Sequence, residues 1–238
     1  MKLEFTQDPD WVLNLKQKLR PFVSGIVDGN LFREMAAGTL TMKQFRGALL
    51  HFYPLIENFP KYMGLTLAKI PEGGAPRNNN AREWLLENMN IERRHADWYR
   101  NWAVSFGVSD RALSKQVVPP PEIDAINNYL WRVVSYGSLA EALAAVNFGI
   151  EGPTGVWTRH VKHNIRAYEG RPGVKFGKKS LLWLKAHADY DDRHPEEALE
   201  LVKLFALTKA EQKRVVFAAQ RSMEYYRLAA DACYEIFA

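Results

Sequence analysis

Apolar residues recur at helical spacing along almost the whole of this chain, and this feature most limits the folds open to it. No long run of alternating apolar and polar residues is bounded by turn residues, as a half-buried strand would require. The chain has 238 residues, of which 47% are hydrophobic, enough to bury a large core. The sequence therefore predicts an all-α protein.

Turn residues and prolines divide this pattern into the helices that we expect. They are a helix from residues 8–10 to a break at 28–30, a short helix at 31–37, an apolar segment at 45–70 kinked at Pro54 and Pro60, helices at 80–106, 109–116 and 122–149, a helix resuming after an interruption at 150–155, one from 178 and a last one from 208. Pro195 either kinks the helix from 178 or begins a new one. No linker separates two cores, so we expect a single domain over residues 1–238, a bundle of roughly seven to nine helices.

Charge and cysteine usage limit the partners and the cellular compartment that we expect. The net charge is +5, but basic and acidic residues are interleaved, which argues against a nucleic-acid partner. The single cysteine, Cys233, excludes an intramolecular disulfide framework and fits a reducing compartment. No signal peptide is visible, and no apolar stretch approaches the ~20 residues that span a bilayer. We expect a cytoplasmic protein, and a homodimer is left open.

One polar segment carries the first candidate ligands. His187, Asp191 and His194 stand at i, i+4 and i+7, so in one helix their side chains would share a face. Two imidazoles and a carboxylate on one face suit a first-row transition metal. The alternative is an exposed, polar helix end.

Two other segments supply further candidates. Glu92 and His95 form a Glu-x-x-His pattern, by which helical bundles present ligands to paired iron ions. The alternative is a carboxylate paired with an arginine beside a core histidine. Glu151 lies next to Gly152 and Pro153, directly after an apolar stretch, where a buried carboxylate is costly without a cation or several donors. An exposed turn residue is the alternative there.

Taken together, these candidates give three carboxylates and three imidazoles. They are Glu92, His95, Glu151, His187, Asp191 and His194. A mixed oxygen and nitrogen set without cysteine suits iron or manganese and argues against structural zinc and iron–sulfur clusters. His160 and His163 lie in a basic run and are expected to be solvated.

Three motifs carry a resemblance to a known family. They are residues 92–98 (ERRHADW), 147–157 (NFGIEGPTGVW) and 183–199 (WLKAHADYDDRHPEEAL). In order and spacing the chain resembles the haem-oxygenase-like diiron oxidases over residues 40–207, and within them the branch that converts a medium-chain fatty acid to a terminal alkene.

The resemblance implies a seven-helix, haem-oxygenase-like (TenA-like) bundle that uses no haem. It also implies one iron held tightly by Glu92, His95, Glu151 and His187, and a second, labile iron held by Asp191 and His194 with help from the glutamates. Thiaminases of similar fold need a mid-chain nucleophilic cysteine, whereas Cys233 is near the C-terminal end, so we discount that activity.

The implied reaction is O2-dependent oxidation of a small carboxylate-containing substrate, with an external electron donor. Loss of CO2 from a fatty acid would leave a terminal alkene. Two alternatives remain: an amine N-oxygenase or carbon–carbon-cleaving amino-acid oxidase on the same metal site, and a metal-free binding or regulatory bundle.

The walls of the substrate pocket are the remaining expectation. Aromatic and apolar residues near the candidate ligands are taken as its lining, although such residues at helical spacing are more often plain core. They are His51, Phe52, Tyr53, Phe59, Ile91, Trp98, Phe148 and Trp157.

Overall fold

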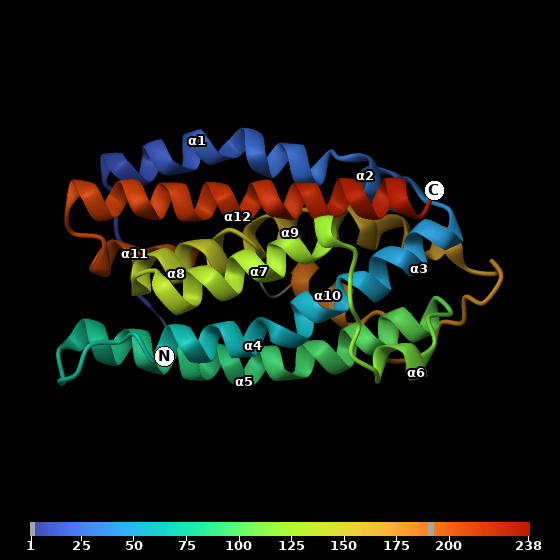
Figure 1. Cartoon of the computed structure of the whole chain (residues 1–238), viewed down its shortest axis with the longest axis horizontal. Helices are drawn as coiled ribbons and strands as arrows, with labels where there is room; N and C mark the ends of the chain where they lie inside the picture. Colours follow the sequence, from blue (N-terminus) through green and yellow to red (C-terminus); the bar gives the residue numbers. More distant parts are fainter. Residues whose placement is uncertain (1–2, 190–192) are drawn as a thin grey trace.

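Helices arranged in layers build the protein, as the sequence predicts (Figure 1). The computed structural model describes residues 3–189 and 193–238. The helical segments of this part are α1 (Asp10–Val27), α2 (Asn30–Ala37), α3 (Met42–His51), α4 (Tyr53–Leu67), α5 (Pro76–Ser105), α6 (Asp110–Leu113), α7 (Pro121–Tyr136), α8 (Leu139–Leu143), a π-helical turn (Ala144–Phe148), α9 (Glu151–Asn164), a 3-10 turn (Ile165–Tyr168), α10 (Leu182–Asp189), α11 (His194–Phe205) and α12 (Lys209–Ile236).

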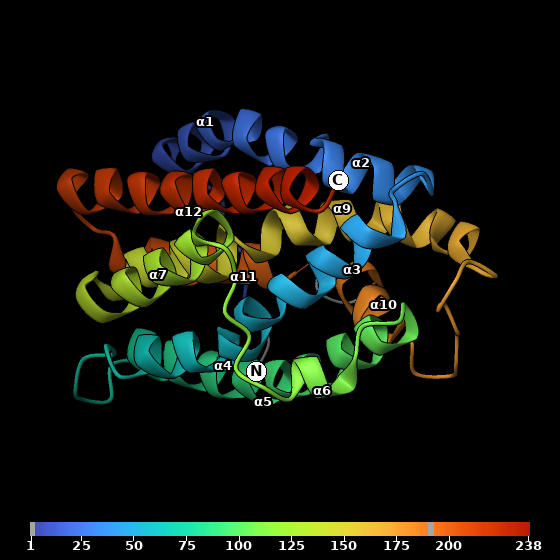
Figure 2. The ribbon, with the colours of Figure 1, turned by 45° about the vertical axis from the view of Figure 1, so that its right-hand side comes forward.

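The helices lie in three layers that both views show. Helices α1 and α12 run side by side on one side of the molecule, α4 and α5 on the other, and α7, α9 and α11 between them (Figures 1 and 2). Each described α-helix contributes buried side chains to one hydrophobic core. The middle layer therefore has apolar neighbours on both sides, which is where a buried site can form.

Aromatic side chains dominate the core beneath this layer. The Phe45 ring stacks on Phe106 with centroids 4.2 Å apart and meets Trp102 edge-on at 6.0 Å. Trp102 in turn stacks on Trp183 of α10 at 5.3 Å. Such offset and edge-on pairs add about 0.5–1.5 kcal/mol each beyond burial of their area. The cluster thus fixes α10 against α3 and α5.

Two prolines begin helices instead of kinking them. The apolar segment predicted at residues 45–70 is divided, because α3 ends at His51 and α4 begins at Tyr53 with Pro54 in its first turn. Likewise Pro195 lies in the first turn of α11, which begins at His194. The N–H groups of a helix's first turn have no partner within the helix, so a proline there costs no hydrogen bond. These starts, together with the division of the stretch expected at 122–149 into α7 and α8, help to raise the number of described α-helical segments to twelve, above the seven to nine expected.

The interruption predicted at residues 150–155 lies elsewhere. Gly149 and Ile150 have right-handed helical dihedral angles, and α9 begins at Glu151, so Gly152 and Pro153 are inside a helix. The irregularity is upstream, at the π-helical turn, where the Gly149 N–H bonds to the Ala144 carbonyl at 2.9 Å. This bond spans five residues instead of four, which is the bonding of a π-helix.

No described helix is both long enough and apolar enough to cross a bilayer.

Candidate metal centre

Helix α5 places the first pair of candidate ligands. Glu92 and His95 are one turn apart on it, and both are buried. The His95 Nδ1 lies 2.9 Å from a carboxylate oxygen of Glu92. Burial alone would raise the pKa of the Glu92 carboxyl, but His95, His187 and His194 together lower it below its ordinary value. The alternative in which Glu92 pairs with an arginine is not what the structure shows.

Helix α10 brings a second imidazole to this pair. The His187 ring lies 4.7 Å from the His95 ring, centroid to centroid, and packs at 4.0 Å on the ring of Trp183. Its Nδ1 is 2.9 Å from the Trp183 carbonyl oxygen, which can only accept, so Nδ1 carries the hydrogen. The other ring nitrogen, Nε2, is therefore the one suited to bind a metal.

Glu151 reaches the site from the first residue of α9. Its side chain is buried, and the amide of Asn147, in the π-helical turn, donates to its Oε1 at 2.7 Å. Asn147 is fully buried, and its Oδ1 has no hydrogen-bond partner within the described part of the chain. The π-helical turn thus brings a fixed donor against a buried carboxylate, and π-turns are frequent at functional sites.

His187 and His194 lie on different helices. The helix expected to carry all three ends at Asp189, and His194 begins α11. His194 Nδ1 is 3.5 Å from Glu151 Oε2, and its side chain is 15% exposed. Asp191 lies outside the described residues. The shared helical face predicted for His187 and His194 is therefore wrong, because α11 begins at His194 with Pro195 in its first turn.

These contacts test whether the side chains suit iron. Three imidazoles and two carboxylates from α5, α9, α10 and α11 converge in the interior, and this donor set fits iron. Within residues 3–189 and 193–238, no three His, Cys, Asp or Glu side chains stand arranged as a ready metal cage. Instead Glu92 contacts His95 and Glu151 contacts His194. The residues fit the metal by type and place, and binding would require side-chain rotation.

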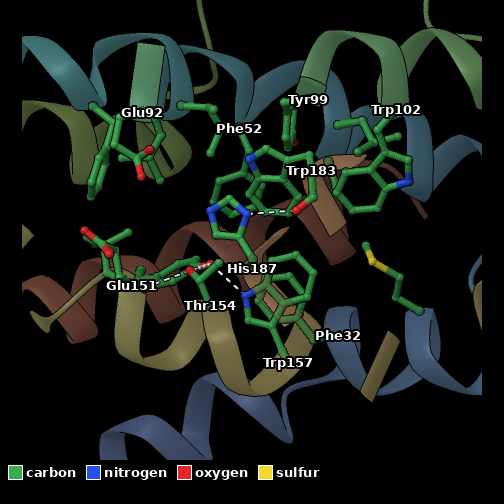
Figure 3. A pocket seen from close by; sticks show the side chains of 18 residues that line it. Phe32, Phe52, Glu92, Tyr99, Trp102, Glu151, Thr154, Trp157, Trp183 and His187 are labelled. Atoms are coloured by element: carbon green, nitrogen blue, oxygen red, sulfur yellow. Dashed lines mark hydrogen bonds between the residues drawn. The ribbon is translucent and has the colours of Figure 1, made fainter. Parts of the chain in front are cut away.

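A largely apolar cavity adjoins these ligands (Figure 3). It encloses about 640 Å³ of empty space, part of it open to solvent, and Glu92, Glu151 and His187 lie in its wall. Of the predicted wall residues, Phe52, Phe59 and Trp157 line it. The lining that sequence reasoning missed includes Phe32, Met35, Leu49, Leu55, Ile56, Tyr99, Trp102, Thr154, Trp183 and Tyr226.

Five predicted wall residues lie elsewhere. The His51 ring stacks on Phe237 at 5.0 Å, and Tyr53 lines a separate polar cleft. The ring of half-buried Trp98 lies 5.2 Å from the ring of His95, centroid to centroid, but Trp98 does not line the cavity. Ile91 is also half-buried and lies outside the cavity, and Phe148 lines a second cavity. Aromatic composition alone could not tell these positions from the wall. His160 and His163 are exposed, as predicted.

One cavity wall carries a hydrogen-bonded hydroxyl pair. The Trp157 indole N–H donates to the Tyr226 hydroxyl at 2.8 Å, and that hydroxyl lies 3.0 Å from Thr154 Oγ1. The Thr154 hydroxyl donates to the Ile150 carbonyl at 2.8 Å, so Tyr226 is the donor within the pair. Burial raises the pKa of Tyr226 to about 12, so it remains a neutral phenol.

Comparison with solved structures defines the class of protein. The chain is 32% identical to a TenA homologue from Pseudomonas syringae pv. tomato, with a TM-score of 0.87 over 97% of this chain and 98% of that one. A Shewanella denitrificans domain with a heme oxygenase-like fold (16% identity, TM-score 0.77, coverage 95% and 93%) and a TenA homologue from Pyrococcus furiosus (16%, 0.75, 94% and 100%) share the fold. The protein therefore has the TenA-like, haem-oxygenase-like helical fold.

The family follows from a second comparison. The model of the family described as iron-containing redox enzyme matches residues 46–227. The chain belongs to this family. No curated protein matches it.

Proposed function

We propose that this protein is a non-haem, iron-dependent oxidase that uses O2 to act on a small carboxylate-containing substrate, with conversion of a medium-chain fatty acid to a terminal alkene as the favoured reaction. The observation that carries the proposal is the buried convergence of Glu92, His95, Glu151, His187 and His194 beside an apolar cavity. Membership of the iron-containing redox family supports it.

Burial separates the proposed ligands into two groups. Glu92, His95, Glu151 and His187 are each less than a tenth exposed, whereas the side chain of His194 is 15% exposed. We assign the buried four to a tightly held iron. A second, looser iron would involve His194 and Asp191. When bound, iron would supply the activation of O2 and the oxidising power for hydrogen removal.

In this proposal the protein orients the iron ligands and keeps water away from the substrate. The Trp183 carbonyl fixes the ring of His187, and Asn147 fixes the carboxylate of Glu151. The apolar walls suit an alkyl chain and exclude water. No lysine or arginine lines this cavity within the described residues, while Glu92 and Glu151 do. A substrate carboxylate would therefore need the positive charge of the metal.

The same two carboxylates favour the first alternative. An amine carries no negative charge for Glu92 and Glu151 to repel, so an amine oxygenase on the same metal site has a physical basis. Iron-loaded protein, O2 and a one-electron reductant should be incubated with lauric acid. Headspace 1-undecene supports the fatty-acid reaction. Its absence, together with O2 uptake that depends on an added amine or amino acid, would favour the alternative.

A metal-free bundle and a thiaminase are separated by two further assays. Anaerobic loading followed by metal analysis should show iron retained by the protein and lost in His187→Ala. Equal, negligible iron in both proteins would leave a binding or regulatory bundle. Thiamin hydrolysis is not expected, because burial raises the pKa of the Cys233 thiol and the main cavity is not lined by it.

Asn147→Leu is expected to weaken iron binding without unfolding the protein. The change removes the amide that donates to Glu151, and loss of such an outer hydrogen bond costs roughly 10–100-fold in metal affinity. Anaerobic titration with ferrous ion measures the effect. Asn128→Leu, at an exposed asparagine on α7, is the control. Equal affinities in both variants would remove Asn147 from this role.

A further inference from the structure

A second cavity meets the candidate metal centre at Glu151. It lies between α1, α9, α11 and α12 and encloses about 620 Å³, including the part open to solvent. Among the described residues, Glu151 is the one side chain that lines both this cavity and the main one. The two cavities therefore approach the same carboxylate through different walls.

The walls of the second cavity are mainly apolar, with three charged side chains among them. Val23, Phe148, Val156, Pro195 and Met223 form its apolar lining, and Arg159 of α9 is the third charged residue beside Glu151 and Glu196. Glu151 forms the buried inner end, whereas Glu196 at the other end has a side chain that is 47% exposed. The apolar part of this wall suits a small neutral molecule, because it offers an ion no polar partner.

Two features keep the passage open. Gly152 and Gly155, on the cavity side of α9, have no side chains, and a Cβ added at Gly152 would find its nearest neighbour, Pro195 Cβ, 4.0 Å away. At the outer end, Lys16 of α1 holds Glu196 at 2.6 Å. The outer end of the cavity is thus held to α1 by an ion pair, and the wall beside Glu151 carries no side chain at Gly152 and Gly155.

We propose that this second cavity is the entrance by which O2 reaches the candidate metal centre. The identity of the gas rests on the proposed oxidase function, because O2 is its small apolar co-substrate. A substrate that fills the main cavity would cover Glu92, Glu151 and His187 from that side. A separate apolar approach to Glu151 lets O2 arrive after the substrate is bound.

Xenon binding tests the passage without iron or turnover. Xenon occupies dry apolar cavities, so crystals of the metal-free protein under xenon pressure should show density between Phe148 and Met223. In Val156→Trp, where an indole replaces a small wall residue, that density should disappear. His160→Trp, an exposed position on the same helix outside the cavity, is the matched control and should retain it. No xenon in the unaltered protein would overturn the inference.

The rate of reaction with O2 gives the functional readout. Mixing reduced, iron-loaded protein with O2 in stopped flow should show a severalfold slower reaction in Val156→Trp, with iron affinity and helical content unchanged, and no slowing in His160→Trp. An unchanged rate in Val156→Trp would overturn the entrance. If the iron-loaded protein consumes no O2 although xenon binds, the proposed oxidase function fails, while the cavity's affinity for an apolar gas stands.

Discussion

Glu151→Ala will abolish O2-dependent turnover while leaving the helical content of the protein intact. Glu151 is buried at the meeting point of both cavities, beside His194 and under the amide of Asn147, so no other described carboxylate can replace it. The alanine fits a helix well, because it has the highest helix propensity. Iron content, turnover and circular dichroism should be measured on the same preparation.

The matched control for this variant is Glu169→Ala. Glu169 is an exposed acid whose partner is Arg166, and a surface ion pair of this kind contributes about 0–1 kcal/mol. This variant should keep full iron content and turnover. If Glu151→Ala were to retain turnover, Glu151 would not be a ligand, and the proposed centre would lose its link to the second cavity.

Phe45→Ala will lower the free energy of unfolding by about 3–5 kcal/mol, the range for deleting a buried phenylalanine side chain. The Phe45 ring is fully buried and contacts Phe106, Trp102 and Tyr168, with centroid distances of 4.2, 6.0 and 4.8 Å. Its removal leaves a cavity that these rings cannot close. Urea unfolding monitored by tryptophan fluorescence measures the loss, because Trp102 and Trp183 belong to the same cluster.

The same substitution at an exposed position is the control for Phe45. The Phe217 side chain on α12 is 57% exposed and lies under the Arg221 guanidinium at 5.3 Å. Phe217→Ala should change stability within about 0.5 kcal/mol, as surface substitutions usually do. A similar loss in both variants would mean that the aromatic cluster does not carry the stability assigned to it.

The fold could be read from the sequence because helical periodicity and capping residues are local signals. Thr41 and Thr208, for example, cap α3 and α12 with capping boxes. The roles of Pro54 and Pro195 could not be settled in the same way. A proline is compatible with a kink and with a first turn, and neighbouring helices decide between them.

The candidate site was predictable where its residues lie close together in sequence. Glu92 and His95 follow from their spacing within one helix, and the structure brings Glu151, His187 and His194 to them. Their role as iron ligands stays a prediction. The cavity wall was harder to predict from the sequence. Tyr99 and Ile91 both lie on α5, and only tertiary packing decides that Tyr99 faces the cavity. Asn147 begins the motif at residues 147–157, but its role as the donor to Glu151 could not be predicted, because a π-helical turn has no sequence signature in this chain.

The π-helical turn makes the hydrogen-bonding pattern of one turn a condition of the site. From Leu139 to Asn164 the backbone stays helical, but residues 144–148 accommodate one residue more than an α-helix would. If these residues took up α-helical bonding at unchanged chain length, every later side chain would turn by about 100° around the helix axis. Glu151 would then turn away from Glu92 and His187 although no ligand had been substituted. The hydrogen bonding of this one turn is therefore as much a requirement of the interior as the acids and histidines themselves.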